Sequence, residues 1–440
     1  MNKFLNLSIL LSLVFVSQAC SISNNGKDEI ELELVTDRAI LDPMVTVTNR
    51  PINMTVNASK STNGQLFSAP SLVERYALSP IEVNINGTVI PLSCNDIYNE
   101  DGNSYGHYLT LTYHSRGSEY AGGVHYFDTP GGFVDLQLTN NRVDWNTSHM
   151  WRIGNESTRE MVIAGDTRLG PVAHRLQWES PEQGPDGRFI AGDSLSISRN
   201  EFFVAPGASA NHITRMNGQL VLSTGNENEA AGVFLLNDSG DQITDRHTIT
   251  GIKGLYPVDN STLVALRDNG TSNASLLVYD MSNNDLQTFR TIALSAPISP
   301  RFGKNDVFAR GQIVYLSMGE NGLAVVDLTD DSESTYDGFN GPINSVFVDD
   351  LYVYVAAGGS VYFMQEDETS GELVTVSSMS RSEIAGNQDS DLVSVNEITS
   401  GVGDFYTLDD QGNRVTRNIR NQRFIAIAAG RLGARLYFMD

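Results

Sequence analysis

The stretch Gln312-Ile313-Val314-Tyr315-Leu316-Ser317-Met318-Gly319-Glu320-Asn321-Gly322-Leu323-Ala324-Val325-Val326-Asp327 decides the fold. It contains an apolar strand, a turn with glycine, and a second apolar strand that ends on Asp. A second copy is Tyr352-Val353-Tyr354-Val355-Ala356-Ala357-Gly358-Gly359-Ser360-Val361-Tyr362-Phe363-Met364. One hairpin cannot bury its own apolar face, so repeated hairpins must pack on one another. The pattern therefore predicts an all-β repeat protein.

The same hairpin recurs along most of the chain. Its first strands are centred on Leu109, Val162, Val221, Val264, Val314, Val353, Val393 and Ile425. These anchors are roughly 32 to 59 residues apart, which brackets the 40–50 residues of a four-stranded propeller blade and exceeds a solenoid coil. Eight anchors predict a β-propeller of seven or eight blades. The number is seven if two anchors belong to the same blade. No long stretch has the period or the caps of a helix.

The two ends of the chain suggest how such a ring closes. The last repeat stops at Asp440 with its second strand, which would leave an unpaired edge. The alternation in Ile30–Val35 fits a half-buried strand, and we expect this segment to pair there. Between Pro43 and Pro80 the pattern is hard to interpret, whereas Asn86-Gly87 joins two short apolar runs as a hairpin turn. We expect one propeller domain over residues 30–440, least certain over residues 30–80.

The two plainest repeats resemble a known family. The segment Val314–Leu328, ending in Gly322-Leu323-Ala324-Val325-Val326-Asp327-Leu328, is similar to the LVIVD-type repeat of bacterial surface and periplasmic β-propellers, and Val353–Met364 is similar to the YVTN type. The copies before residue 250 match these repeat types less closely. The resemblance implies a propeller and an extracytoplasmic setting, and it carries no catalytic residues.

The N-terminus predicts export. Lys3 gives a short positive region, Phe4–Val16 is largely apolar, and Ser17-Gln18-Ala19 offers the small residues that a signal peptidase prefers. Residues 1–19 therefore read as a signal peptide. No later apolar run reaches the roughly 18 residues that a membrane helix needs.

Cys20 directly follows the predicted cleavage site. Val16-Ser17-Gln18-Ala19-Cys20 resembles a bacterial lipobox, in which that cysteine becomes the lipid attachment site. Ordinary cleavage, which would leave a soluble periplasmic or secreted protein, is the alternative. Residues 20–29 then form a polar tether. By resemblance to bacterial lipoproteins, Ser21 indicates the outer membrane, on its periplasmic or surface face.

Cys94 is the only other cysteine. If Cys20 is lipidated, Cys94 has no partner within the chain and is expected to be a small buried side chain. A Cys20–Cys94 disulfide is the alternative if Cys20 carries no lipid.

Charge narrows the choice of partners. With 29 Lys and Arg against 53 Asp and Glu, the net charge is −24, which repels phosphates at long range. Nucleic acid is therefore excluded as an expected partner, and contact with the membrane is expected through the lipid anchor only. A solvated acidic surface is favoured over cation binding.

No catalytic motif is present, so we predict no catalytic residues and no cofactor. The seven histidines have no metal-ligand spacing and read as structural: His107, His114, His125, His149, His174, His212 and His247. Acidic loops lie at residues 99–103, 327–331 and 409–413. Ordinary turn chemistry is favoured for them over calcium binding, and the residues of any metal site are unknown. Nucleophile elbows, phosphate loops and dinucleotide fingerprints are missing.

Two functions remain. The favoured one is a non-enzymatic binding or scaffold propeller that holds a protein or glycan at the cell envelope. The alternative is a propeller-type hydrolase or lactonase with a metal in the central channel. Convergence of at least three Asp, Glu, Asn or His side chains at the channel mouth would favour the enzyme, and a channel of small or apolar side chains would exclude it.

Overall fold

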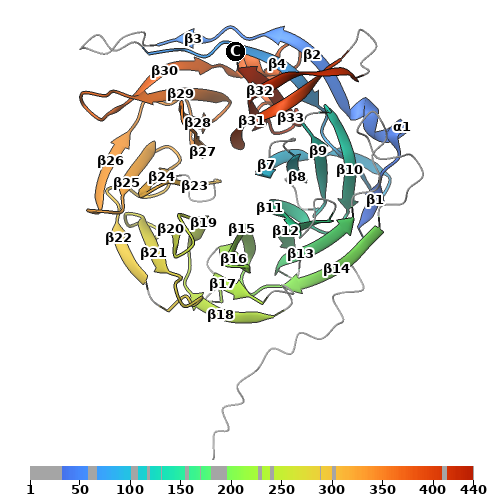
Figure 1. The fold of residues 1–440 in the computed structure, drawn as a ribbon. Helices are drawn as coiled ribbons and strands as arrows, with labels where there is room; N and C mark the ends of the chain where they lie inside the picture. The colour runs from blue at the N-terminus through green and yellow to red at the C-terminus, as the bar shows by residue number, and fades with distance from the viewer. Residues whose placement is uncertain are drawn as a thin grey trace, which may run out of the picture.

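The computed structural model is a ring of seven four-stranded antiparallel blades around a central channel (Figure 1). It describes residues 32–57, 67–100, 108–115, 119–129, 131–153, 158–168, 170–179, 196–225, 230–237, 242–287, 289–299, 304–408 and 414–439. The prediction of an all-β propeller with seven or eight blades is confirmed, with seven as the number. The predicted signal peptide, Cys20 and the tether lie outside the described residues.

The first four blades follow one another along the chain, and each runs from its innermost to its outermost strand. Blade 1 contains β7 (Ser93–Glu100), β8 (Tyr108–His114), β9 (Gly122–Asp128) and β10 (Phe133–Asn140). Blade 2 contains β11 (Asp144–Ile153), β12 (Thr158–Thr167), β13 (Gly170–Glu179) and β14 (Ser196–Val204). Blade 3 contains β15 (Ser209–Met216), β16 (Gln219–Gly225), β17 (Gly232–Leu236) and β18 (Ile243–Thr248). Blade 4 contains β19 (Ile252–Pro257), β20 (Thr262–Arg267), β21 (Ser275–Asp280) and β22 (Phe289–Ala293).

The last three blades include the two hairpins that decided the fold. Blade 5 contains β23 (Val307–Arg310), β24 (Ile313–Ser317), β25 (Leu323–Asp327) and β26 (Ser332–Tyr336). Blade 6 contains β27 (Ile343–Val348), β28 (Val353–Ala357), β29 (Ser360–Glu366) and β30 (Leu373–Met379). Blade 7 contains β31 (Glu397–Leu408), β32 (Arg414–Ala428), β33 (Ala434–Met439) and, from the N-terminal region, β4 (Leu72–Leu78).

Seven of the eight anchors lie on the second strand of a blade, one in each blade. Val393 is the exception, because it lies just after the 3₁₀ helix η3 (Ser390–Leu392), in the connection from blade 6 to blade 7. It is 2% exposed and packs in an apolar cluster, so an apolar connection looked like a strand. The prediction of a first strand centred on Val393 was therefore wrong, since the first strand of blade 7 is β31, which pairs with β32.

A strand from the N-terminal region closes the ring, as predicted, but it is a different strand. β4 pairs with β33, where Leu72 lies opposite Met439 and Leu78 opposite Ala434. The segment expected to do this forms β1 (Glu33–Val35), which instead adds to the outer edge of blade 1 beside β10. The closing strand comes from the stretch between Pro43 and Pro80 that was hard to interpret.

Glu74 explains why β4 was missed. Alternate residues of β4 are buried, and Glu74 holds one of these inward positions with only 4% of its surface exposed. Its carboxylate lies 3.2 Å from Nε of the buried Arg435 and accepts a 2.7 Å hydrogen bond from Nε of Arg50. The ion pairs satisfy a buried charge that breaks the apolar alternation on which strand prediction depends.

The rest of the N-terminal region follows the outer rim of the ring (Figure 1). β2 (Val45–Pro51) pairs with β4 as the fifth strand of blade 7, and β3 (Thr55–Val56) pairs with β30 as the fifth strand of blade 6. The other elements are the helix α1 (Arg38–Leu41), the 3₁₀ helix η2 (Asp42–Met44), the helix α2 (Arg381–Ala385) and the hairpin β5 (Glu82–Ile85) with β6 (Thr88–Pro91). One chain segment thus holds the first and the last two blades together.

The hairpin predicted at Asn86-Gly87 is confirmed. Ile85 pairs with Thr88, and both turn residues have positive φ, 53° for Asn86 and 85° for Gly87. These angles match the type I′ turn, whose twist agrees with that of the two strands.

The core lies between the blades. Apolar side chains from the facing surfaces of neighbouring blades form separate buried clusters, such as the one that joins blades 4 and 5 around Val264, Leu276, Val314 and Val326. This is the physical reason for the repeat, because each blade buries its apolar faces only against its neighbours. In the described residues no helix is long and apolar enough to cross a lipid bilayer.

Candidate binding site in the central channel

The innermost strands start with a shared irregularity. In β7, β11, β15, β19 and β27, the pairing with the second strand shifts around a single residue. Such a bulge leaves one residue unpaired and redirects its side chain. The bulged residues are Asn95, Asn146, Asn211, Lys253 and Asn344. Asn305 and Asn396 hold similar places just before β23 and β31.

Five of these asparagines tie neighbouring blades together, and we call them the asparagine belt. Each side-chain amide donates to a backbone carbonyl at the start of the next blade. The bonds run from Asn95 to Asn146 O (2.9 Å), Asn146 to Ala210 O (3.0 Å), Asn211 to Ile252 O (2.5 Å), Asn344 to Val395 O (2.8 Å) and Asn396 to Cys94 O (2.8 Å). The last bond joins blade 7 to blade 1, so the belt spans the point of ring closure.

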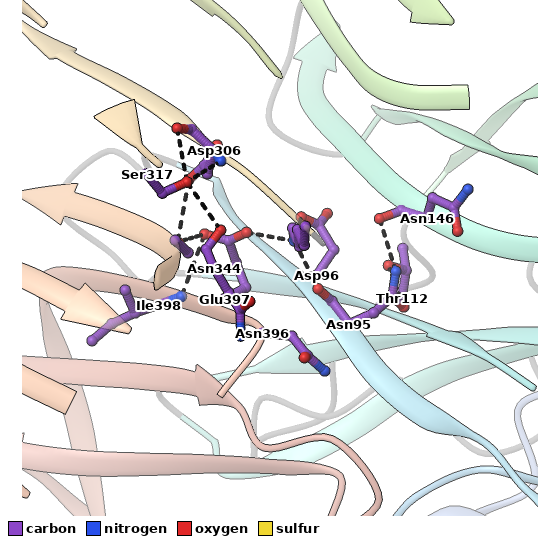
Figure 2. A network of polar contacts seen from close by, with 12 residues as sticks. Asn95, Asp96, Thr112, Asn146, Asp306, Ser317, Asn344, Asn396, Glu397 and Ile398 are labelled. Atoms are coloured by element: carbon purple, nitrogen blue, oxygen red, sulfur yellow. Dashed lines mark hydrogen bonds and ion pairs between the residues drawn. The ribbon is translucent and has the colours of Figure 1, made fainter. Parts of the chain in front are cut away.

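The residue that follows each of the five bulged residues, and the residues that follow Asn305 and Asn396, form a second layer, the channel ring. Its members are Asp96, Thr147, His212, Gly254, Asp306, Ser345 and Glu397. Three of the seven are carboxylic acids from blades 1, 5 and 7. Figure 2 shows Asp96, Asp306 and Glu397 within one network of polar contacts.

Lys304 is the cation of this ring. Its ammonium donates to Asn95 O at 2.7 Å and to Asp96 Oδ1 at 3.1 Å, and it lies 2.5 Å from Glu397 Oε2. These contacts match the three protons that an ammonium can donate. Burial opposes the charge, but the three carboxylates raise the pKa of Lys304 above its usual value. One lysine from blade 5 thus bridges blades 1 and 7 across the channel.

Ser345 links two of these carboxylic acids. Its hydroxyl lies in hydrogen-bond contact with Glu397 Oε1 and 3.2 Å from Asp306 Oδ2. A hydroxyl has one proton, so both contacts can be full hydrogen bonds only where one of the two acids is protonated and donates. Burial raises the pKa of Asp306 and, well above its usual value, that of Glu397. The geometry fits a neutral Glu397 that donates to Ser345, which donates to Asp306.

A polar bowl of about 760 Å³ opens on the side of the ring where the inner strands begin. Its wall includes the asparagine belt, and its base is the channel ring. Further charged and titratable side chains line it: His114, Asp144, Asp166, Lys253 and Arg381. Burial raises the pKa of Asp166 to about 6, against the hydrogen bonds it accepts from Asn146, Ala210 and Ser209. The bowl therefore presents amides, carboxylates and cations together.

The histidines predicted to be structural lie in different places. His125 is fully buried between Tyr113 OH (3.0 Å) and Gln137 Oε1 (2.9 Å), and burial lowers its pKa to about 4. His174 is also buried, and His247 contacts Tyr279 OH at 2.8 Å. His114 lines the bowl, His212 belongs to the channel ring, and His107 lies outside the described residues.

The strand-ending aspartates of the repeat cap turns. Asp280 Oδ1 accepts from Ser282 N at 3.0 Å, and Asp327 Oδ1 accepts from Thr329 N at 2.8 Å. Within residues 327–331, Asp330 accepts from Ser332 N and Asp331 pairs with Arg290. These contacts are the turn chemistry favoured for this loop, while the loop at 409–413 lies outside the described residues. Calcium there stays a prediction.

Cys94 is fully buried, as expected for a small core side chain, and burial raises the pKa of its thiol. It lies in the strand that carries Asn95 and Asp96, where it helps pack the start of blade 1. Within the described part of the chain, no group of three or more His, Cys, Asp or Glu is arranged to hold a metal ion.

The sequence contains a signal for this site that the repeat analysis overlooked. A pair of polar residues precedes an apolar one at the start of nearly every inner strand. The copies are Asn95-Asp96-Ile97, Asn211-His212-Ile213, Asn305-Asp306-Val307, Asn344-Ser345-Val346 and Asn396-Glu397-Ile398. The apolar anchors lie on the second strands. An alignment of the repeats on these anchors therefore does not reveal the polar pattern at the start of the inner strands. Alignment on the asparagines would have found the belt and the ring.

Comparison with known proteins finds distant structural similarities only. No family profile matches the chain, and no curated protein is similar to it in sequence. Among solved structures, it is similar to Sqt1 of Saccharomyces cerevisiae, with 11% identity over 82% of this chain and 98% of the other, at a TM-score of 0.47. The chain is also similar to the WD40 domain of coronin from Toxoplasma gondii. The identity is 11% over 82% of this chain and 88% of the other, and the TM-score is 0.45. A third similar structure is the computationally designed Ika8 protein. The identity is 10% over 89% of this chain and 98% of the other, and the TM-score is 0.42.

Proposed function

We propose that this propeller is a non-enzymatic binding module of the bacterial cell envelope, exported and anchored through a lipid on Cys20. Its bowl would hold a protein or glycan partner. The observation that carries this proposal is the bowl itself, where side chains from all seven blades converge on a concave polar surface at the channel mouth. Loops and strand ends on a rigid ring are a common place for binding sites.

A glycan is the partner that the bowl suits better. Sugar hydroxyls both donate and accept hydrogen bonds, and the bowl offers carboxylate acceptors, amide carbonyls and cationic donors side by side. A flat protein surface would not reach the base of such a concavity. The net charge of −24 further favours neutral or cationic partners over strongly acidic ones.

The hydrolase alternative retains one supporting observation. Asp96, Asp306 and Glu397 do converge in the channel, although in the described residues these side chains are not arranged to hold a metal ion. Against it, the ammonium of Lys304 already lies among these carboxyl groups and pairs with two of them. A divalent cation would have to displace this lysine, which argues against a metal site in the ring.

A binding experiment on the soluble mature chain tests the proposal. Residues 21–440 would be screened against an array of bacterial envelope glycans, and hits measured by calorimetry. Arg381→Glu places a negative charge at the exposed bowl wall, and we expect it to weaken a true hit at least about tenfold. Arg168→Glu makes the same change at an exposed arginine outside the bowl and should have no effect. Equal loss in both variants, or no hit, would contradict the glycan proposal.

The anchor is tested separately. Cys20→Ser should release the protein from membranes into the soluble fraction, since a lipid chain and not a helix would hold it. Mass spectrometry of the N-terminal peptide should show acyl chains on wild type and none on the variant. Unchanged membrane fractionation of Cys20→Ser would refute the lipid attachment.

A further inference from the structure

A second cavity lies beyond the channel ring, on the side away from the bowl. It has a volume of about 280 Å³ and shares Asp96, His212, Asp306 and Glu397 with the bowl. Its other lining residues come from later positions of the inner strands, so the two cavities follow one another along the channel. We call this second cavity the channel chamber.

Aromatic side chains dominate the wall of the chamber. They lie two residues after the channel ring in five of the seven blades: Tyr98, His149, Tyr256, Phe308 and Phe347. On one side, the ring centroid of Phe308 lies 4.7 Å from those of both Tyr256 and Phe347. On the other side, Tyr98 and His149 are 4.4 Å apart. All five side chains are only partly buried, so the chamber is bounded by an open arc of aromatic rings.

The remaining wall carries hydroxyl groups. Thr147, Thr214 and Thr399 line the chamber and are almost fully buried. Ser148 also lines it, is only 3% exposed, and its hydroxyl has no hydrogen-bond partner among the described residues. A buried hydroxyl without a hydrogen-bond partner costs free energy. Its position on this wall is explained if a bound ligand supplies the missing hydrogen bond.

The end of the chamber at the channel ring is negatively charged. Three carboxylic acids face one ammonium, so even with one of the acids protonated the remaining carboxylates outnumber the cation by one. The nearby imidazoles add no positive charge at neutral pH, because burial lowers the pKa of His212 and lowers that of His149 to about 3. A cation in the chamber would meet π faces on its sides and carboxylates at its end.

We propose that the channel chamber binds a small organic cation, a quaternary or primary alkylammonium group held between the aromatic arc and the carboxylates of the channel ring. Aromatic faces attract such cations most strongly where water is excluded. The chamber, with a volume of about 280 Å³, is large enough for a ligand of the size of choline. The chamber lies across the channel ring from the bowl, so this proposal does not depend on the glycan proposal.

Calorimetry with choline and an uncharged isostere tests the proposal. Choline and 3,3-dimethylbutan-1-ol have nearly the same shape and differ in charge, so a cation site should bind the alcohol at least about tenfold more weakly. Equal binding of the two would show a merely apolar pocket, and binding of glucose in place of choline would show a sugar site. Either result, or no binding of choline at millimolar concentration, overturns the proposal.

Variants locate the site. Phe308→Leu and Phe347→Leu each remove one face of the aromatic arc and should raise the Kd for choline about fivefold or more, while Asp306→Asn should weaken it by removing a carboxylate. Phe289→Leu makes the same aromatic change on the outer strand β22 and should leave binding unchanged. Thermal melting identifies any variant that does not fold, and a second arc variant then replaces it. Unaltered binding in both arc variants contradicts the chamber as the site.

The source of the cation is a separate arm of the same experiment. Acetyl-trimethyl-lysine methylamide carries the trimethylammonium group on a peptide unit, so tighter binding than choline indicates a side chain of a partner protein. Tighter binding of choline indicates a free small molecule. Failure of the glycan array alone leaves these measurements untouched, because they use a different cavity.

Discussion

The ammonium of Lys304 lies 2.5 Å from the carboxylate of Glu397, and this contact links blade 5 to blade 7 across the central channel. It also determines what the channel can hold, because the same lysine pairs with Asp96 of blade 1. Polar groups from distant parts of the chain thus meet where the fold has no regular core. The channel is therefore both a structural joint and the candidate binding site.

Removing the cation should destabilise the ring. Lys304→Met leaves three carboxylic acids close together with no counter-charge, and we expect the free energy of unfolding to fall by about 3 kcal/mol at neutral pH. Urea unfolding followed by tryptophan fluorescence measures the change. Lys253→Met, which alters the lysine of the bowl wall, should cost much less. Equal losses in the two variants would show that the channel ring does not depend on Lys304.

Neutralising Glu397 should have little effect, in contrast. Burial raises the pKa of Glu397 well above its usual value, which favours the neutral acid, and Glu397→Gln puts another neutral group of the same shape in its place. We expect a loss below about 1 kcal/mol, because the amide can still donate to Ser345. A loss as large as that of Lys304→Met would mean that Glu397 is ionised in the native protein.

The stability of the protein should depend on Asp166 between about pH 4 and pH 6. Burial raises its pKa from 3.8 to about 6, so the native state holds a proton that the unfolded state has released. The stabilisation is complete below pH 4 and is lost as the pH rises through 6, by about 3 kcal/mol. Asp166→Asn removes this contribution, and its melting temperature should change less over that range than that of wild type. Parallel pH curves for the two proteins would contradict the assignment.

Ring closure should depend on the buried pair at Glu74. Glu74→Ala leaves Arg435 buried without its partner, and we expect a loss of about 3 kcal/mol in the free energy of unfolding. Because β4 would then separate from β33 more readily, the variant should also be cleaved faster by protease within residues 67–80. Glu82→Ala, on the exposed face of β5, is the matched control. Unchanged proteolysis at residues 67–80 would show that the pair does not hold the closing strand.

The asparagine belt should contribute at each junction between blades. Asn344→Ala removes the 2.8 Å bond to Val395 O and leaves a carbonyl of blade 7 without this donor, which should cost about 1–2 kcal/mol. Asn340→Ala changes an exposed asparagine four residues earlier and should be neutral within about 0.5 kcal/mol. Thermal unfolding distinguishes them. Similar melting temperatures for both variants would show that the asparagine belt does not contribute to stability.

Much of the fold follows from apolar periodicity. Strands buried on both faces, such as Val353–Ala357, are continuous apolar runs bounded by turn residues, and the sequence displays them directly. Closure by an N-terminal strand could also be anticipated from the unpaired last repeat. Which strand closes could not, because the buried charge of Glu74 is paired with Arg435, more than three hundred residues later in the chain, as well as with Arg50. Such a long-range ion pair leaves no local pattern.

The site was harder to predict for a related reason. The residues of the channel ring are single polar positions at strand starts, and each looks like ordinary turn chemistry in isolation. Only the closed ring brings Asp96, Asp306 and Glu397 together around Lys304. The repeated asparagine was visible in the sequence, yet its role depends on the neighbouring blade. Repeat analysis by apolar anchors therefore finds the blades and misses what they surround.

The most direct test of the account is the position of a bound cation in a crystal. Crystals soaked with (2-bromoethyl)trimethylammonium would be measured at the bromine absorption edge, where the anomalous signal marks the ligand without a model of the protein. The account predicts a peak in the channel chamber, with the ammonium between Phe308 and His149 and next to the carboxylates of Asp306 and Glu397. A peak only elsewhere on the protein, or an empty chamber at a concentration above the measured Kd, would contradict it.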